Sequence, residues 1–282
     1  MKFGFVTCVQ LGLACMEEIY RVGGKLDLVV TLKDDLAKGK SGRVYIDNFC
    51  AEHSIQVVKI CNVNDESVVN AVRERRIDWL FIVGWSQIAR AAILQAPRRG
   101  VLGMHPTLLP TGRGRAAIPW AILKKLPETG VTLFQLDEGV DTGSIIAHER
   151  LPLAPDETAT HLYRRVAEAH QKMLRRVWWD LVEDRITPQT QDESKATVWP
   201  GRKPENGEIK SSMTVEEADC LVRATTHPYP GAFWQEAGTK VIVWEGRKAT
   251  QPHQPPPGAK SLQLADGIFY ALNYELEASA TT

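Results

Sequence analysis

The sequence predicts an α/β protein in which a mostly parallel β-sheet, covered by helices, is followed by a small β-rich domain. Over the first 185 residues, short apolar runs alternate with amphipathic stretches, the pattern of repeated strand–helix–strand units. After Ile186 the chain becomes polar and proline-punctuated, and then continues as strand-like runs. Its 282 residues are enough for two such parts. We therefore expect one domain over 1–186 and a second over 187–282.

Each expected element follows from its residue pattern. In the first domain, continuous apolar runs predict strands at Lys2–Val9, Asp27–Leu32, Gln56–Ile60, Trp79–Val83, Val101–His105, Val131–Leu136 and Ile145–Leu151. Apolar residues spaced three or four apart predict helices at Leu13–Arg21, Arg43–His53, Glu66–Arg75, Gln87–Leu94, Ala116–Lys124 and Thr158–Glu183. In the second domain, the same patterns predict a helix at Thr214–Ala224 and strands at Lys240–Trp244, Ser261–Leu264 and Ile268–Leu272.

Composition narrows the class of protein. Lys and Arg together number 34, as do Asp and Glu, so no net charge draws the chain to nucleic acid or to an anionic membrane. Five cysteines without a CxxC pair predict reduced, buried thiols. The first sixteen residues superficially resemble a secretory leader, but Thr7, Gln10 and Gly12 interrupt the apolar run. We expect a cytoplasmic protein with no membrane span, and the sequence leaves a homodimer open.

The common phosphate and metal motifs do not occur in the sequence. The turn after the first expected strand has no GxGxxG pattern, and Gly39-Lys40-Ser41 lacks the upstream glycine of a Walker loop. No HExxH or paired CxxC spacing is present, so we expect no metal.

The stretch from Val101 to Ser144 carries the candidate chemistry. His105 ends an expected strand, and Asp141 lies in the glycine-bearing loop that follows a later strand. Ligands of parallel sheets bind beyond the carboxyl ends of the strands, where a carboxylate can set the tautomer of an imidazole and assist proton transfer. The spacing alone is equally compatible with a solvated turn acid and a capping histidine.

Several motifs here resemble one enzyme family. They are His105–Pro110, Arg113–Arg115, Ile118–Trp120, Glu128–Thr132 and Asp137–Gly143 in the first domain, with Arg202–Gly207 and Arg223–Phe233 in the second. Together they resemble the 10-formyltetrahydrofolate-dependent formyltransferases, which include the methionyl-tRNA, glycinamide ribonucleotide and sugar-nucleotide enzymes. The resemblance covers residues 1 to about 245. It implies a Rossmann-like catalytic domain, a C-terminal domain that is OB-like or related, and 10-formyltetrahydrofolate as co-substrate.

The resemblance also implies roles for individual residues. His105 and Asp141 match the catalytic histidine and aspartate of the family. The positions that match folate contacts are Gln87, Ile88, Ala89, Thr107, Leu108, Leu109, Pro110, Arg115, Asp137, Glu138, Gly139 and Val140. At Gly103 the family has an asparagine whose amide donates to the developing oxyanion. Because Gly103 and His105 share one face of the expected strand, we predict that an asparagine side chain at 103 would point into the open crevice.

The acceptor amine is inferred from charge. Residues 191–282 contain nine basic and twelve acidic side chains, a balance that disfavours tRNA. The basic segment 38–43 follows the second expected strand, where Lys40 and Arg43 could hold a diphosphate. With Gly103, these residues form our predicted substrate site, and a nucleotide-linked amino sugar is the predicted substrate. The segment reads equally well as a solvated loop.

Three alternatives stay open at this stage. The first is a methionyl-tRNA formyltransferase. The second is a non-catalytic folate- or nucleotide-binding relative, because Gly103 lacks the family amide. The third is a hydrolase that releases formate from the folate, a group that usually resembles chains with an N-terminal regulatory domain.

Overall fold

The computed structural model describes residues 1–37, 42–249 and 255–278. The chain forms two compact units, each assembled from separate segments. The first comprises Met1–Arg113, Gly130–Leu151 and Val166–Val198, and the second comprises Gly114–Thr129, Pro152–Arg165 and Trp199–Thr282. The boundary at residue 186 stays a prediction.

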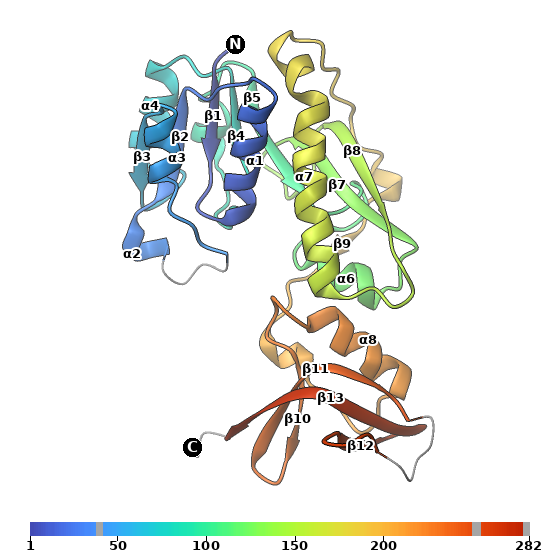
Figure 1. The fold of residues 1–282 in the computed structure, drawn as a ribbon. Coiled ribbons are helices and arrows are strands. Elements are labelled where there is room, and N and C mark those ends of the chain that lie inside the picture. Colours follow the sequence, from blue (N-terminus) through green and yellow to red (C-terminus); the bar gives the residue numbers. More distant parts are fainter. Residues whose placement is uncertain (38–41, 250–254, 279–282) are drawn as a thin grey trace. The chain divides into compact units, whose positions relative to one another are not determined.

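The first unit is built on a seven-stranded sheet of order β3-β2-β1-β4-β5-β7-β8 (Figure 1). Its strands are β1 (Phe3–Val6), β2 (Leu28–Leu32), β3 (Val57–Ile60), β4 (Trp79–Ile82), β5 (Gly100–His105), β7 (Glu128–Gln135) and β8 (Ile145–Pro152). The first five are parallel, whereas β7 runs antiparallel to β5. The expected mostly parallel, Rossmann-like sheet is confirmed.

Helices connect the strands of this unit. They are α1 (Gln10–Arg21), α2 (Asp34–Ala37), α3 (Asp47–Glu52), α4 (Glu66–Glu74), α5 (Ala91–Leu94) and the 24-residue α7 (Ala159–Val182), whose first residues belong to the second unit. One face of the sheet buries valines and leucines of β1, β2, β4 and β5 against α4 and α5. On the other face, Trp178 of α7 packs on Phe3, with ring centroids 4.4 Å apart. Apolar burial on both faces explains why these strands read as continuous apolar runs.

The second unit contains a four-stranded antiparallel sheet of order β10-β11-β13-β12. Its strands are β10 (Ala232–Glu236), β11 (Thr239–Lys248), β12 (Lys260–Leu264) and β13 (Gly267–Ala278). Helix α8 (Val215–Thr225) packs on this sheet, and α6 (Ala117–Leu123) contacts α8. Thr214 caps α8 by accepting a hydrogen bond from the backbone N–H of Glu217 at 3.2 Å. The expected β-rich C-terminal part is confirmed.

Short elements complete the chain. The connector after α7 contains a 3₁₀ turn at Glu193–Lys195 and β9 (Val198–Trp199), which pairs with β6 (Arg113–Gly114). A second 3₁₀ turn spans Pro204–Gly207. Four of the five cysteines are buried thiols, but Cys61 is exposed, which corrects the expectation for that residue. None of the helices in the described ranges is both long and apolar enough to span a membrane.

Candidate active site

The carboxyl ends of three adjacent strands bring the candidate loops to one edge of the sheet. Strands β1, β4 and β5 are neighbours and run parallel, so the segments after Val6, Ile82 and His105 emerge side by side. The loop after β4 approaches the loop after β1 closely at Gly84, which has a left-handed φ of 64°. A Cβ there would lie 2.4 Å from Cγ2 of Val9, so only glycine fits this approach.

His105 and Asp141 meet, as the sequence predicts. Nδ1 of His105 lies 3.5 Å from Oδ2 of Asp141, and both side chains are largely buried. Nε2 of His105 lies 2.8 Å from the carbonyl oxygen of Gly112. Because a carbonyl oxygen can only accept, Nε2 carries a hydrogen in this arrangement. Both ring nitrogens therefore face oxygen atoms, and these contacts orient the imidazole.

The route by which Asp141 reaches His105 differs from the expectation. Since β7 is antiparallel to β5, with His105 opposite Thr132 and Leu102 opposite Gln135, β7 ends beside the beginning of β5. The two side chains therefore do not come from neighbouring strand ends. The loop 137–143 must run back toward His105, and tertiary contacts hold it there.

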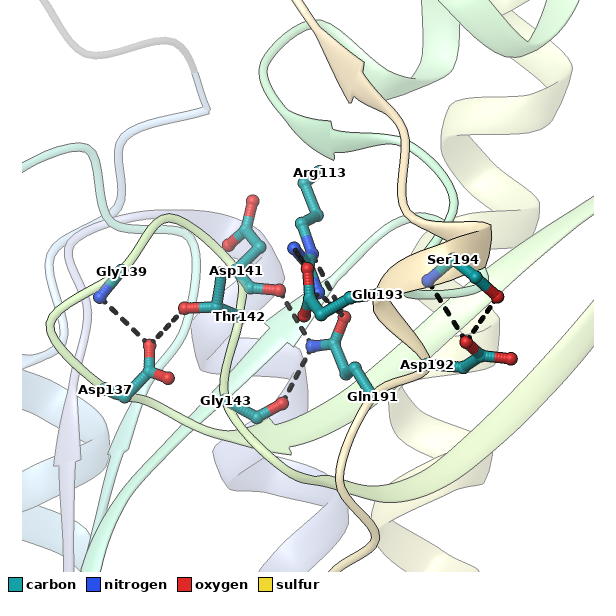
Figure 2. Close-up of polar contacts among 10 residues, drawn as sticks. All are labelled: Arg113, Asp137, Gly139, Asp141, Thr142, Gly143, Gln191, Asp192, Glu193 and Ser194. Carbon is teal, nitrogen blue, oxygen red and sulfur yellow. Dashed lines mark hydrogen bonds and ion pairs between the residues drawn. The ribbon is translucent and has the colours of Figure 1, made fainter.

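Hydrogen bonds within this loop shape its first half. Oδ1 of Asp137 accepts from the backbone N–H of Gly139 at 3.1 Å and from the hydroxyl of Thr142 at 2.6 Å (Figure 2). A Cβ on Gly143 would lie 1.7 Å from the carbonyl oxygen of Gln135. Only glycine therefore allows the end of the loop to pass this close to the end of β7. The predicted folate-contacting segment from Asp137 to Val140 is exposed.

The second predicted folate segment is positioned by side chains from another loop. The expected helix is wrong over residues 87–90, because helix α5 begins only at Ala91. The Gln87 amide accepts from the backbone N–H of Val63 at 2.8 Å and donates to the carbonyl of Cys61 at 3.0 Å. Asn64 donates to the carbonyl of Ile88 at 2.9 Å. Ile88 is left 74% exposed, and Ala89 packs partly against the core.

The turn after His105 is fixed by Thr132 of β7. The Thr132 hydroxyl donates to the carbonyl of Thr107 at 2.7 Å and accepts from the backbone N–H of Leu109 at 3.0 Å. Thr107 and Leu109 are buried, and Leu108 and Pro110 are half-buried. The hydroxyl of Thr107 makes no hydrogen bond within the described part of the chain.

Gly103 does not face open space. It is buried, and a Cβ placed on it would lie 2.6 Å from Cδ2 of Leu136 and 3.2 Å from Cε1 of Phe134. The expectation that an asparagine side chain would point freely into the crevice is therefore wrong, because Leu136 occupies that position. A direct contact of Gly103 with substrate stays a prediction.

The remaining predicted binding residues are distributed as follows. Lys40 lies outside the described residues. Arg43 pairs with the segment after β1 through an antiparallel bridge to Val9, and its guanidinium lies 3.9 Å from the ring centroid of Tyr45. Arg115 is exposed and belongs to the second compact unit.

A second histidine, His170, lies close to His105. His170 of α7 is fully buried, and its Nδ1 donates to the carbonyl of Val166 at 2.7 Å. Burial, with a smaller contribution from the neighbouring His105, lowers the pKa of His170 to about 4. His170 is therefore neutral when the protein is folded near neutral pH.

This histidine predicts a pH dependence of stability. Because the unfolded chain protonates His170 near its usual pKa of 6.5 whereas the folded chain does so only near 4, the unfolded state takes up more protons between these values. We expect wild type to lose up to about 3 kcal/mol more unfolding free energy than His170→Gln as the pH falls from 7 to 4. Urea unfolding of both proteins across this range is the measurement. Parallel stability curves would show that His170 does not contribute.

Comparisons with known proteins agree with this architecture and site. The family model "Formyl transferase" matches residues 11–178, and the model "Formyl transferase, C-terminal domain" matches residues 202–269. The fold is that of an enzyme class with a Rossmann-like sheet followed by a small β-rich domain. The chain belongs to the formyl transferase family. The prediction of a formyltransferase is thereby confirmed.

Solved structures share the whole fold at low identity. WlaRD, a sugar 3N-formyltransferase determined with dTDP and 5-N-formyl-tetrahydrofolate, is 18% identical, with a TM-score of 0.70 over 97% of this chain and 98% of its own. An N-formyltransferase from Helicobacter canadensis, in complex with folinic acid and dTDP-3-aminofucose, is 16% identical, with a TM-score of 0.69 over 96% and 98%. Methionyl-tRNA formyltransferase from Clostridium thermocellum is 20% identical, with a TM-score of 0.62 over 99% of both chains.

Proposed function

We propose that this enzyme transfers the formyl group of 10-formyltetrahydrofolate to the primary amine of a nucleotide-linked amino sugar, with His105 and Asp141 as the catalytic pair. The observation that carries the proposal is the approach of Nδ1 of His105 to Oδ2 of Asp141 at 3.5 Å, within a chain of the formyl transferase family. The pair lies next to the strand ends where ligands of parallel sheets bind.

The reaction needs two kinds of help from the protein. The neutral amine attacks the formyl carbon, a new C–N bond forms, and negative charge develops on the formyl oxygen. An imidazolium at His105, stabilised by Asp141, balances this charge when Nε2 exchanges its hydrogen bond to Gly112 for one to the oxyanion. Asp141 takes the proton from the attacking amine. His105 gives its Nε2 proton to the folate nitrogen as the bond between that nitrogen and the formyl carbon breaks, and transfer of the proton from Asp141 to His105 then restores the imidazolium.

The residues near this pair suit a folate. A pteridine offers polar edges and a flat apolar face, so its pocket needs both exposed apolar side chains and a few polar groups. Ile88 is 74% exposed and Val140 is 60% exposed, each on a loop that matches the folate segments of the family. The buried hydroxyl of Thr107 makes no hydrogen bond within the described residues, so it is available to a ligand.

Charge and position support a nucleotide-linked amino sugar as acceptor. The excess of acidic over basic side chains in residues 191–282 opposes binding of a long polyanion such as tRNA. The backbone N–H of Gln10, at the start of α1, donates to the carbonyl of Gly42 at 2.7 Å, which places Arg43 beside the end of β1. Two relatives with this fold were solved with dTDP or a dTDP-linked amino sugar. Arg43 would contact the diphosphate.

A thermal-shift screen followed by an activity assay tests the proposal. A folate, a dTDP-linked amino sugar and initiator tRNA are added singly and in pairs, because a ligand that binds the native state raises the melting temperature by mass action. We expect shifts from the folate and the nucleotide sugar, and formylation of the sugar amine. Efficient formylation of methionyl-tRNA with a steep salt dependence would instead assign the tRNA function.

Arg43 supplies a prediction about the acceptor. Changing Arg43 to Met removes the guanidinium, so we expect KM for the nucleotide sugar to rise about tenfold while KM for the folate is unchanged, since one charge-assisted contact is worth roughly 1.5–3 kcal/mol. Lys59→Met is the matched control, because Lys59 pairs with the same Asp34 but lies on β3. If both substitutions raise KM for the nucleotide sugar equally, the effect comes from the overall positive charge of this region and not from a direct contact of Arg43 with the diphosphate. Lys40→Met, assayed in the same way, tests the other predicted diphosphate contact.

A further inference from the structure

We propose that Gln191, in the connector between α7 and β9, is a positioning residue that holds Asp141 against His105. The sequence pattern marks residues 187–204 as a polar linker, yet in the structure this segment returns to the candidate site. Gln189 forms an antiparallel bridge with Ile145, directly after the loop that carries Asp141. The inference rests on the catalytic role proposed above for Asp141.

Asp141 occupies a backbone conformation that needs support. Its φ is 56°, in the left-handed region that few residues other than glycine, asparagine and aspartate adopt. The loop also leaves β7 at the end remote from His105, and the hydrogen bonds of Asp137 organise Gly139 and Thr142 without reaching the Asp141 backbone. Contacts from outside the loop can therefore set the position of this turn.

Gln191 provides that contact. Its Nε2 donates to the carbonyl oxygen of Asp141 at 2.8 Å and to that of Gly143 at 2.7 Å, so one amide group binds both sides of the turn (Figure 2). Gln191 is only 5% exposed, so water does not compete freely for these carbonyls.

Arg113 fixes the orientation of the Gln191 amide. Nε and Nη2 of Arg113 donate to Oε1 of Gln191 at 3.1 and 2.8 Å. Since a guanidinium only donates, the amide oxygen must face Arg113 and the amide nitrogen must face the loop. Glu193 in turn accepts from Nη1 of Arg113 at 2.9 Å, but its own side chain is 69% exposed and touches neither Asp141 nor Gly143 in Figure 2.

The same connector also holds the partner of His105. The Thr197 hydroxyl accepts from the backbone N–H of Gly112 at 2.9 Å, and the Thr197 carbonyl accepts from the backbone N–H of Arg113 at 2.9 Å. Gly112 is the residue whose carbonyl faces Nε2 of His105. Nine residues of connector, 189–197, thus fix the backbone on both sides of the catalytic pair.

Gln191→Glu is the sharpest test because it keeps the shape of the side chain. Its carboxylate still accepts from Arg113, but its second oxygen faces the carbonyls of Asp141 and Gly143 and repels them. We expect kcat to fall about 100-fold, the cost of a small misplacement of a reacting group. KM for the folate and for the amine should stay within about twofold, because Gln191 is buried and is not one of the proposed substrate contacts. Asp192→Asn is the control and should keep wild-type kcat, because the Asp192 carboxylate contacts Ser194 and Lys195 and not Gln191 or Arg113.

A double-mutant cycle with Asp141→Asn separates positioning from a general structural role. If Gln191 acts through Asp141, adding Gln191→Glu to Asp141→Asn lowers kcat no further, whereas a structural role would make the two losses multiply. Full kcat in Gln191→Glu, or multiplying losses, would overturn the inference. Should Gln191→Glu fail to fold, Arg113→Lys, which loses the fork that orients the amide, is read in the same way. Full activity of Asp141→Asn itself would instead overturn the proposed function.

Discussion

Changing His105 or Asp141 to asparagine is expected to lower kcat/KM for formyl transfer by about 10²- to 10⁴-fold, the usual contribution of a positioned acid or base. His105→Asn removes the ring that can carry positive charge beside the formyl oxygen. Asp141→Asn keeps the size of the side chain but removes the carboxylate that lies 3.5 Å from Nδ1 of His105. Steady-state kinetics with 10-formyltetrahydrofolate and the amine measures both effects.

Folate affinity distinguishes loss of catalysis from loss of binding. We expect calorimetry to give nearly unchanged folate Kd for both variants, because the proposed folate contacts lie on the neighbouring loops. His161→Asn is a matched control: Nδ1 of His161 lies 2.7 Å from Oε1 of Glu157, so it removes a histidine–carboxylate pair that belongs to the second unit. The control should retain full turnover. Near wild-type turnover in either site variant would refute the assigned roles.

Restoring the family asparagine at Gly103 is expected to fail as a single change. If the missing amide limits the reaction and the side chain has room, the family resemblance implies a gain in kcat, since an oxyanion donor is worth about 10²- to 10³-fold in rate. The structure reverses this expectation, because Leu136 and Phe134 lie within 3.2 Å of any Cβ at position 103. We expect Gly103→Asn to lower the free energy of unfolding by about 1–3 kcal/mol, as overpacking does, with no rise in kcat.

A paired variant isolates the steric cause. Leu136→Ala removes the methyl group nearest to position 103, so Gly103→Asn should raise kcat when it is compared within the Leu136→Ala background. Gly103→Ala adds the Cβ without the amide. It should be destabilising when Leu136 is present, and it should not increase the rate in either background. A single Gly103→Asn variant with raised kcat and unchanged stability would show that Leu136 moves aside at no cost.

The sequence predicted most of the elements because burial on both faces of a parallel sheet leaves a local signature. The apolar runs at β1, β2, β4 and β5, and the three-to-four spacing of α7, need no distant partner to be recognised. The segment 87–90 was assigned wrongly to a helix. Its irregular backbone is held by hydrogen bonds of Gln87 with the loop after β3, more than twenty residues earlier.

The sequence by itself determined the alternation of strands and helices and the family signature, within which His105 and Asp141 are the candidate catalytic residues. What the tertiary structure decided was which groups surround them. Because β7 runs antiparallel to β5, the loop that carries Asp141 must run back along β5. Leu136 packs against Gly103. Gln191 donates a hydrogen bond to the backbone of Asp141, fifty residues earlier in the chain. Contacts of this kind join residues far apart in the chain, and they depend on strand direction and on side-chain packing in three dimensions. A local pattern of residues reports its own burial, but it does not specify which distant backbone group will supply its hydrogen bonds.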